Sequence, residues 1–218
     1  MSNREITTVL FDLDGTIIDT NELIIESFLH ALQGIVPDTF SREDIIPKMG
    51  LTLKQQFQIF SGREEVDDLM KIYRAYNLSK HDEMVSLFPG VAEAIPQLRA
   101  QGMKLGVVTT KMRDSTERAL RLLGVYDAMD VIVTLDDVEH AKPHPEPVLK
   151  AIRALGSEPA ATLMIGDSTA DIESAIRAGA VPIGVAWSLK GEEVLKNAGA
   201  RHILRDMKQL FTLIGTEQ

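Results

Sequence analysis

The feature that most constrains the fold is a regular alternation of short apolar runs with helix-period segments. The runs lack polar alternation, which is typical of strands that are covered on both faces. Such strands pair in parallel sheets flanked by helices, so the sequence predicts an α/β fold with a doubly wound parallel sheet. The predicted strands are 7–12, 104–109, 131–134, 162–166, 181–185 and 202–204, and the predicted helices are 115–123, 146–155, 169–178, 190–198 and 207–214.

Residues 20–86 break this rhythm, because they contain no second buried strand. They show helix-period patterns at 22–32, 53–61 and 65–76. We interpret the stretch as an all-helical domain inserted after the first strand. The predicted division is an α/β core of residues 1–17 and 87–218 and a helical domain of residues 18–86.

The composition excludes several kinds of function. The absence of cysteine rules out disulfides, thiolate nucleophiles, zinc–thiolate sites and iron–sulfur clusters, so oxygen or histidine must bind any metal. The formal charge of -9 is unfavourable for binding nucleic acids or anionic membrane surfaces. An acidic protein that binds a phosphate compound needs a divalent cation or local lysines at the site.

The same sequence offers no membrane segment. Its apolar runs fall far short of the ~20 residues that a spanning helix needs. The first residues lack the basic and apolar regions of a signal peptide. We therefore expect a cytoplasmic protein without a membrane partner, whose oligomeric state the sequence does not define.

Charged and hydroxyl side chains follow the predicted strands at their carboxyl ends, where open α/β sheets bind ligands. Taken singly, each of these segments has a structural explanation as a turn or a helix cap. Together they predict one site, because parallel strands end at the same edge of a sheet. The segments are DLDGT at 12–16, TTK at 109–111, KPHP at 142–145 and GDSTAD at 166–171.

The residue types in these segments indicate phosphoryl transfer. Asp12 and Asp14 flank one residue of an extended chain, and Asp167 can join them only if a cation offsets the repulsion. Oxygen ligands favour Mg²⁺, which combines few carboxylates with water and phosphate oxygens. One carboxylate is then free to attack phosphorus, and a second can transfer the proton of the leaving group. Lys142 and the Thr109 hydroxyl would bind the oxygens of the transferring group.

The four segments, in this order, resemble the four motifs of the haloacid dehalogenase superfamily phosphatases, and the helical insertion lies where one subclass carries a helical cap. The resemblance implies a Rossmann-like core, Mg²⁺ as the cofactor and an aspartyl-phosphate intermediate. It also implies the following roles: Asp12 as nucleophile and metal ligand, Asp14 as general acid and base with its backbone carbonyl on the metal, Thr109, Thr110 and Lys142 as phosphate-binding residues, Asp167 as a metal ligand, and Asp171 as a carboxylate on or next to the metal.

Further segments, among them DTNELI, VVTTKMRD and AKPHPEPV, resemble the bacterial pyrophosphatases of this superfamily. This likeness implies hydrolysis of inorganic pyrophosphate to two phosphates, with 2-phosphoglycolate or another small phosphomonoester as the alternative substrate. The candidates for binding the leaving group are Lys54, Arg74 and His81 in the cap, together with Lys111.

Two other classes of protein share parts of the pattern. A serine hydrolase would use Ser168 in a strand–turn–helix motif with His202 as base, but Ala170 stands where that motif has glycine. That reading also leaves Asp12 and Lys142 without a role. A phospho-accepting signalling module also gathers aspartates, a threonine and a lysine at strand ends. A helical insertion would obstruct such a module, and a turnover assay separates it from an enzyme.

Overall fold

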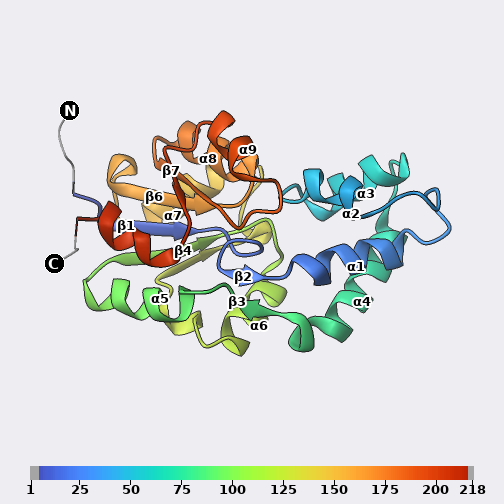
Figure 1. Ribbon diagram of the computed structural model, residues 1–218, viewed down its shortest axis with the longest axis horizontal. Coiled ribbons are helices and arrows are strands. Elements are labelled where there is room, and N and C mark those ends of the chain that lie inside the picture. The colour runs from blue at the N-terminus through green and yellow to red at the C-terminus, as the bar shows by residue number, and fades with distance from the viewer. Residues whose placement is uncertain (1–4, 216–218) are drawn as a thin grey trace.

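The computed structural model describes residues 5–215, and its main body is a parallel sheet between two layers of helices (Figure 1). The strands are β1 (Thr8–Phe11), β4 (Lys104–Val108), β5 (Val131–Val133), β6 (Thr162–Gly166), β7 (Val181–Val185) and β8 (His202–Leu204). They lie in the order β5-β4-β1-β6-β7-β8, and all neighbours pair in parallel. The predicted doubly wound sheet is therefore confirmed. The ends of the predicted core, residues 1–4 and 216–218, lie outside the described residues.

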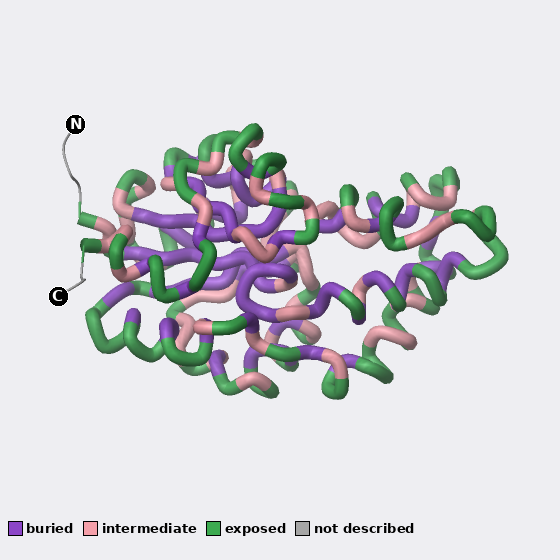
Figure 2. The backbone as a smooth tube through the Cα atoms, in the orientation of Figure 1, coloured by how far each residue is buried: buried purple, intermediate pink, exposed green. Residues whose placement is uncertain are grey.

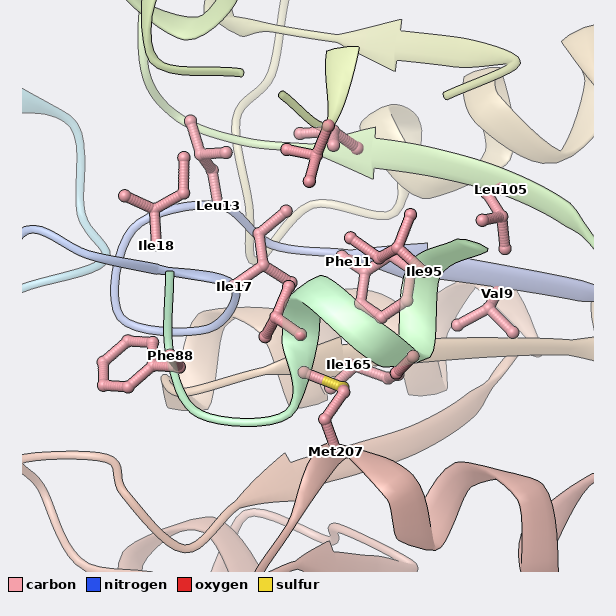
Figure 3. Packing of buried hydrophobic residues seen from close by; sticks show 14 of the residues in the cluster. Val9, Phe11, Leu13, Ile17, Ile18, Phe88, Ile95, Leu105, Ile165 and Met207 are labelled. Atoms are coloured by element: carbon pink, nitrogen blue, oxygen red, sulfur yellow. The ribbon is translucent and has the colours of Figure 1, made fainter. Parts of the chain in front are cut away.

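Helices cover both faces of this sheet, and Figure 2 shows that buried residues are concentrated along the strands. Val9 and Phe11 of β1 pack with Ile95 on one face, whereas Leu10 packs with Val148 on the other. This alternation follows from the two-residue period of a strand, and Figure 3 shows the first of the two clusters. The covering helices are α5 (Val91–Ala100), α6 (Arg113–Leu122), α7 (Glu146–Ala154), α8 (Thr169–Ala178), α9 (Glu192–Asn197) and α10 (Leu210–Leu213).

Two of these helices differ from the sequence predictions by more than two residues at an end. Helix α5 was not predicted, because Pro96 inside it reads as a helix breaker. Its buried residues nevertheless follow helical spacing, at Val91, Ala94, Ile95 and Leu98. The predicted closing helix 207–214 is wrong in its first turn, where the chain forms a 3₁₀ helix at Met207–Gln209 before α10.

The inserted segment is a helical bundle beyond one end of the sheet (Figure 1). Its helices are α1 (Asn21–Ala31), α2 (Arg42–Ile45), α3 (Leu53–Ser61) and α4 (Asp67–Met84), with a 3₁₀ turn at Ile46–Lys48. The bundle has its own hydrophobic core, in which the Phe28 ring lies 4.9 Å from Phe57 and 4.8 Å from Tyr73 between centroids. The predicted helix 65–76 is too short: α4 continues to Met84, because its polar second half gives no apolar stripe from which to read an end.

The two connections between bundle and sheet run side by side. The strands β2 (Ile18–Asp19) and β3 (Ser86–Leu87) form an antiparallel pair, and the amide of Phe88 donates to the carbonyl of Ile17 at 3.1 Å. These strands were not predicted, because two residues are too few for a periodic pattern. Among the helices of residues 5–215, none combines the length and the apolar character needed to cross a membrane.

Candidate active site

The site is built where three adjacent strands end. Counted along the chain, the six strands of the sheet lie in the order 3-2-1-4-5-6, so the central strand β1 has β4 on one side and β6 on the other. Asp12 follows β1, Thr109 follows β4 and Asp167 follows β6. The amide of Asp12 donates to Ile165 at 2.8 Å, and the amide of Thr109 donates to Val133 at 2.9 Å. The sheet therefore fixes the backbone of Asp12 and Thr109 one position beyond their strands, at its topological switch point.

The loop after Asp12 turns sharply and lies against Asp167. Gly15 has a φ of 80°, which favours glycine, and its amide donates to the carbonyl of Ile18 at 2.9 Å. A Cβ on Gly15 would lie 2.6 Å from Oδ2 of Asp167. Only a residue without a side chain allows this loop and the end of β6 to approach so closely.

Lys142 lies at the centre of the site and is almost completely buried, with 2% of its side chain exposed. Its Nζ donates to Oδ1 of Asp12 at 2.6 Å, to Oδ1 of Asp171 at 2.6 Å and to the carbonyl of Val108 at 2.8 Å. Burial opposes the charge of the ammonium, but the attraction of Asp12 and Asp171 outweighs it and raises the pKa of Lys142. All three donors of this ammonium are therefore engaged by the protein.

Three buried carboxylates surround this lysine. Asp12, Asp167 and Asp171 each offer an oxygen, and the three oxygens lie within 4.8 Å of one another. Burial raises the pKa of Asp12 against the attraction of Lys142, and burial likewise raises the pKa of Asp167 against the attraction of Lys190. One buried ammonium does not neutralise three carboxylates, so this group of oxygen ligands fits a divalent cation.

Asp171 and Ser168 are tied together at the start of α8. The Ser168 hydroxyl accepts from the amide of Asp171 at 3.3 Å, and the amide of Ser168 donates to Oδ2 of Asp171 at 3.0 Å, which forms a capping box. The same hydroxyl also donates to Oδ2 at 2.6 Å. Asp171 thus links the helix start to Lys142. The hydroxyl that a serine hydrolase would use is occupied in this cap, and His202 lies on the edge strand β8.

Asp14 has partners different from those of Asp12. Its Oδ1 accepts from Nζ of Lys111 at 2.9 Å and from the Thr20 hydroxyl at 2.9 Å, and its Oδ2 lies 3.2 Å from the same ammonium. Its side chain is 22% exposed. The two carboxylates of the first loop therefore have different surroundings: Asp12 belongs to the buried acidic group and pairs with Lys142, whereas Asp14 is partly exposed and pairs with Lys111.

A cavity of about 840 Å³ lies between this sheet edge and the helical bundle. The structure places nine of the eleven predicted site residues around it, Lys111 among them, whereas Lys142 and Asp171 do not line it. From the core, the cavity is lined by Asp12, Asp14, Thr109, Thr110 and Asp167, and from the bundle by Lys54, Arg74 and His81.

An ion pair between bundle and core holds one of these residues. His81 on α4 is buried, and its Nδ1 lies 2.8 Å from Oδ1 of Asp82. Arg118 on α6 binds both oxygens of Asp82, at 2.9 Å and 2.7 Å, and this contact lowers the pKa of Asp82 to about 2. The sequence did not indicate this pair, because the two residues lie on different helices and show no common motif.

Lys190 is a second cation that the sequence reasoning missed. It follows β7, its Nζ donates to the carbonyl of Met49 in the bundle, and its charge acts on Asp167. A lysine in a loop carries no signal by itself, so only the folded chain reveals this contact.

This fold and this acidic group define a hydrolase family. A model of the haloacid dehalogenase-like hydrolases matches residues 9–185, and the chain belongs to that family, as the motifs predict. Pyrophosphatase PpaX of Bacillus pumilus is 44% identical over 219 residues, which cover 100% of both chains.

Solved structures agree with the fold. A protein from Bacteroides fragilis described as a haloacid dehalogenase-like hydrolase has a TM-score of 0.85 and 30% identity, covering 94% of this chain and 100% of its own. A Lactobacillus plantarum structure described as a phosphoglycolate phosphatase has a TM-score of 0.87 over 96% of this chain and 100% of its own. Its identity of 22% restricts that likeness to the fold.

Proposed function

We propose that this enzyme hydrolyses inorganic pyrophosphate to two phosphates through an aspartyl-phosphate intermediate, with Mg²⁺ as cofactor. The observation that carries the chemistry is the 2.6 Å contact between Asp12 and Lys142 inside a group of three buried carboxylates next to the cavity. The pyrophosphatase relative, similar over the whole chain, supports the choice of substrate. The formal charge of -9 supports a small substrate rather than a nucleic acid.

In this proposal Asp12 is the nucleophile. Lys142 binds its Oδ1, which leaves Oδ2 to attack phosphorus. The bond from phosphorus to the bridging oxygen breaks, and its electron pair stays on the departing phosphate. Water then attacks the phosphoryl group while Asp14 accepts a proton from it, and the bond to Asp12 breaks to return the carboxylate.

The remaining core residues hold the phosphoryl group and the cation. Thr109 and Thr110 would bind the oxygens of the transferring group, where negative charge accumulates. Lys142, whose three donors are held by the protein, would attract the same group through its charge. Asp12, Asp167 and the backbone carbonyl of Asp14 would hold Mg²⁺, with Asp171 supporting Lys142. When bound, Mg²⁺ supplies positive charge that offsets the repulsion between the acidic group and the substrate.

We also propose that residues 18–86 act as the cap that covers the site, with residues 1–17 and 87–218 as the core. The pairing of β2 with β3 at these boundaries supports this division. Lys54, Arg74 and His81 line the cavity from the cap side and are the proposed contacts of the leaving group.

One observation favours 2-phosphoglycolate or another small phosphomonoester as a second candidate. The cavity of about 840 Å³ is larger than pyrophosphate requires, and Leu51, Met70 and Leu78 contribute apolar side chains to it. Phosphate release from pyrophosphate, 2-phosphoglycolate and β-glucose 1-phosphate at equal concentrations decides between these substrates. We expect the highest kcat/KM with pyrophosphate, and a clear preference for phosphoglycolate would refute the proposed substrate.

Addition of Mg²⁺ is expected to raise the melting temperature of the metal-free protein, and more so at pH 8 than at pH 5. Because burial raises the pKa of Asp12 and Asp167, the folded state keeps protons that the unfolded state has released above pH ~4. The stability of the metal-free protein therefore falls as the pH rises. A bound cation replaces those protons and stabilises by about 2.7 kcal/mol at one hundred times its Kd.

Thermal unfolding with Mg²⁺ or with a chelator, at both pH values, measures this effect. The Asp167→Asn variant should lose most of the Mg²⁺-dependent increase. An unchanged melting temperature at pH 8 would contradict a cation site in the acidic group.

A further inference from the structure

Lys111 is held firmly at the edge of the cavity. Its amide donates to the Thr109 hydroxyl at 3.1 Å, and its carbonyl accepts from the amide of Leu135 at 3.1 Å. The side chain lines the cavity and is 13% exposed. A ligand in the cavity can therefore reach this ammonium, unlike the ammonium of Lys142.

One of the three N–H donors of the Lys111 ammonium is available to a ligand. Its hydrogen bonds go to the two oxygens of Asp14, at 2.9 Å and 3.2 Å, and a lysine ammonium has three donors. Within residues 5–215 the structure gives it no third hydrogen-bond partner. The lysine can therefore keep its contact with Asp14 while it binds an anion in the cavity.

Lys142 and Lys111 contact carboxylates with different roles in the proposed reaction. Lys142 binds the nucleophile Asp12, whereas Lys111 binds Asp14, the residue that serves the leaving group. A departing phosphate carries negative charge and is stabilised by a cation. A departing alkoxide is stabilised mainly by a proton, which Asp14 would supply.

We propose that Lys111 determines specificity for phosphoric anhydrides by binding the phosphate that leaves from pyrophosphate. This inference rests on the proposed function and deepens it. As the bond from phosphorus to the bridging oxygen breaks, the electron pair and the growing charge on the departing oxygens lie next to the Lys111 ammonium. Charge-assisted hydrogen bonds of this kind are among the stronger contacts that a site provides.

The Lys111→Met variant tests the proposal with three substrates that differ in the leaving group. Pyrophosphate releases phosphate, which carries concentrated negative charge. p-Nitrophenyl phosphate releases a phenolate, whose charge is spread over the nitrophenyl ring and which needs no proton. Glycerol 2-phosphate releases an alcohol, which needs a proton. We expect kcat/KM for pyrophosphate to fall about 10- to 100-fold, as for a lost charge-assisted hydrogen bond. The other two substrates should stay within about 3-fold, and Lys111→Arg should restore most of the loss because it keeps the charge.

Lys80→Met is the matched control, because Lys80 lies on the exposed surface of α4 and pairs with Glu83. Thermal unfolding of each variant verifies that it is folded. An equal loss with glycerol 2-phosphate would overturn the proposal, since Lys111 would then act only by orienting Asp14. An unchanged pyrophosphate activity would overturn it as well. If the unaltered enzyme failed to hydrolyse pyrophosphate at all, the proposed function and this inference would both fall.

Discussion

Replacement of Asp12 by Asn is expected to abolish phosphate release, by a factor of at least about 10⁴, as for other enzymes that lose their nucleophile. An amide has the shape of the carboxylate but cannot form the acyl phosphate. The variant should remain folded, because it removes one of three mutually repelling buried carboxylates. Phosphate release and thermal unfolding, measured on the same preparation, check both parts.

Asp38→Asn serves as the control for this change, since Asp38 is exposed in the connection between α1 and α2. Its turnover should equal that of the unaltered enzyme. Substantial activity in the Asp12→Asn variant would rule out the aspartyl-phosphate route. Stoichiometric phosphorylation of the unaltered protein without turnover would instead favour a signalling module.

Replacement of Lys142 by Met is expected to lower the free energy of unfolding of the metal-free protein by about 3–5 kcal/mol, the usual cost of removing one partner from a buried ion pair. The reason is that Asp12 and Asp171, each 2.6 Å from the ammonium, lose their shared cation. Urea unfolding in the presence of a chelator measures this loss, and phosphate release should be lost with it.

A second substitution separates this electrostatic effect from simple loss of packing. Combined with Asp171→Asn, the Lys142→Met change should cost less than the sum of the single changes by ~1 kcal/mol or more. Additive losses would show that the lysine contributes mainly by filling space.

The parts of the fold that the sequence predicted best are those with a local signal. The bounds of β6, α8 and β7 agree to the residue, because apolar runs define the strands and the Ser168–Asp171 capping box begins the helix. Helix α5 was missed because Pro96 masked a regular apolar spacing. The short β2–β3 pair depends on contacts between residues about seventy positions apart, and no local sequence pattern predicts such contacts.

The site, too, could be predicted from the sequence only in part. Four segments could be assigned to one sheet edge, because parallel strands end on the same side. Their pairing could not be predicted: neighbours in sequence, Asp12 and Asp14, bind different lysines. The link from His81 through Asp82 to Arg118 also arises only when α4 meets α6. The metal-ligand and phosphate-binding roles of individual residues remain predictions for the experiments above.

The paired strands β2 and β3 have a consequence for how such enzymes diversify. Both connections between the helical bundle and the sheet are adjacent, and the hydrogen bonds of Ile18 with Leu13 and Gly15 join these strands to the loop that follows Asp12. A helical module from a relative could therefore be grafted at two neighbouring splice points without disturbing the sheet. If residues 18–86 form the proposed cap, such chimaeras would take their substrate preference from the new bundle and would keep the α/β core of this chain.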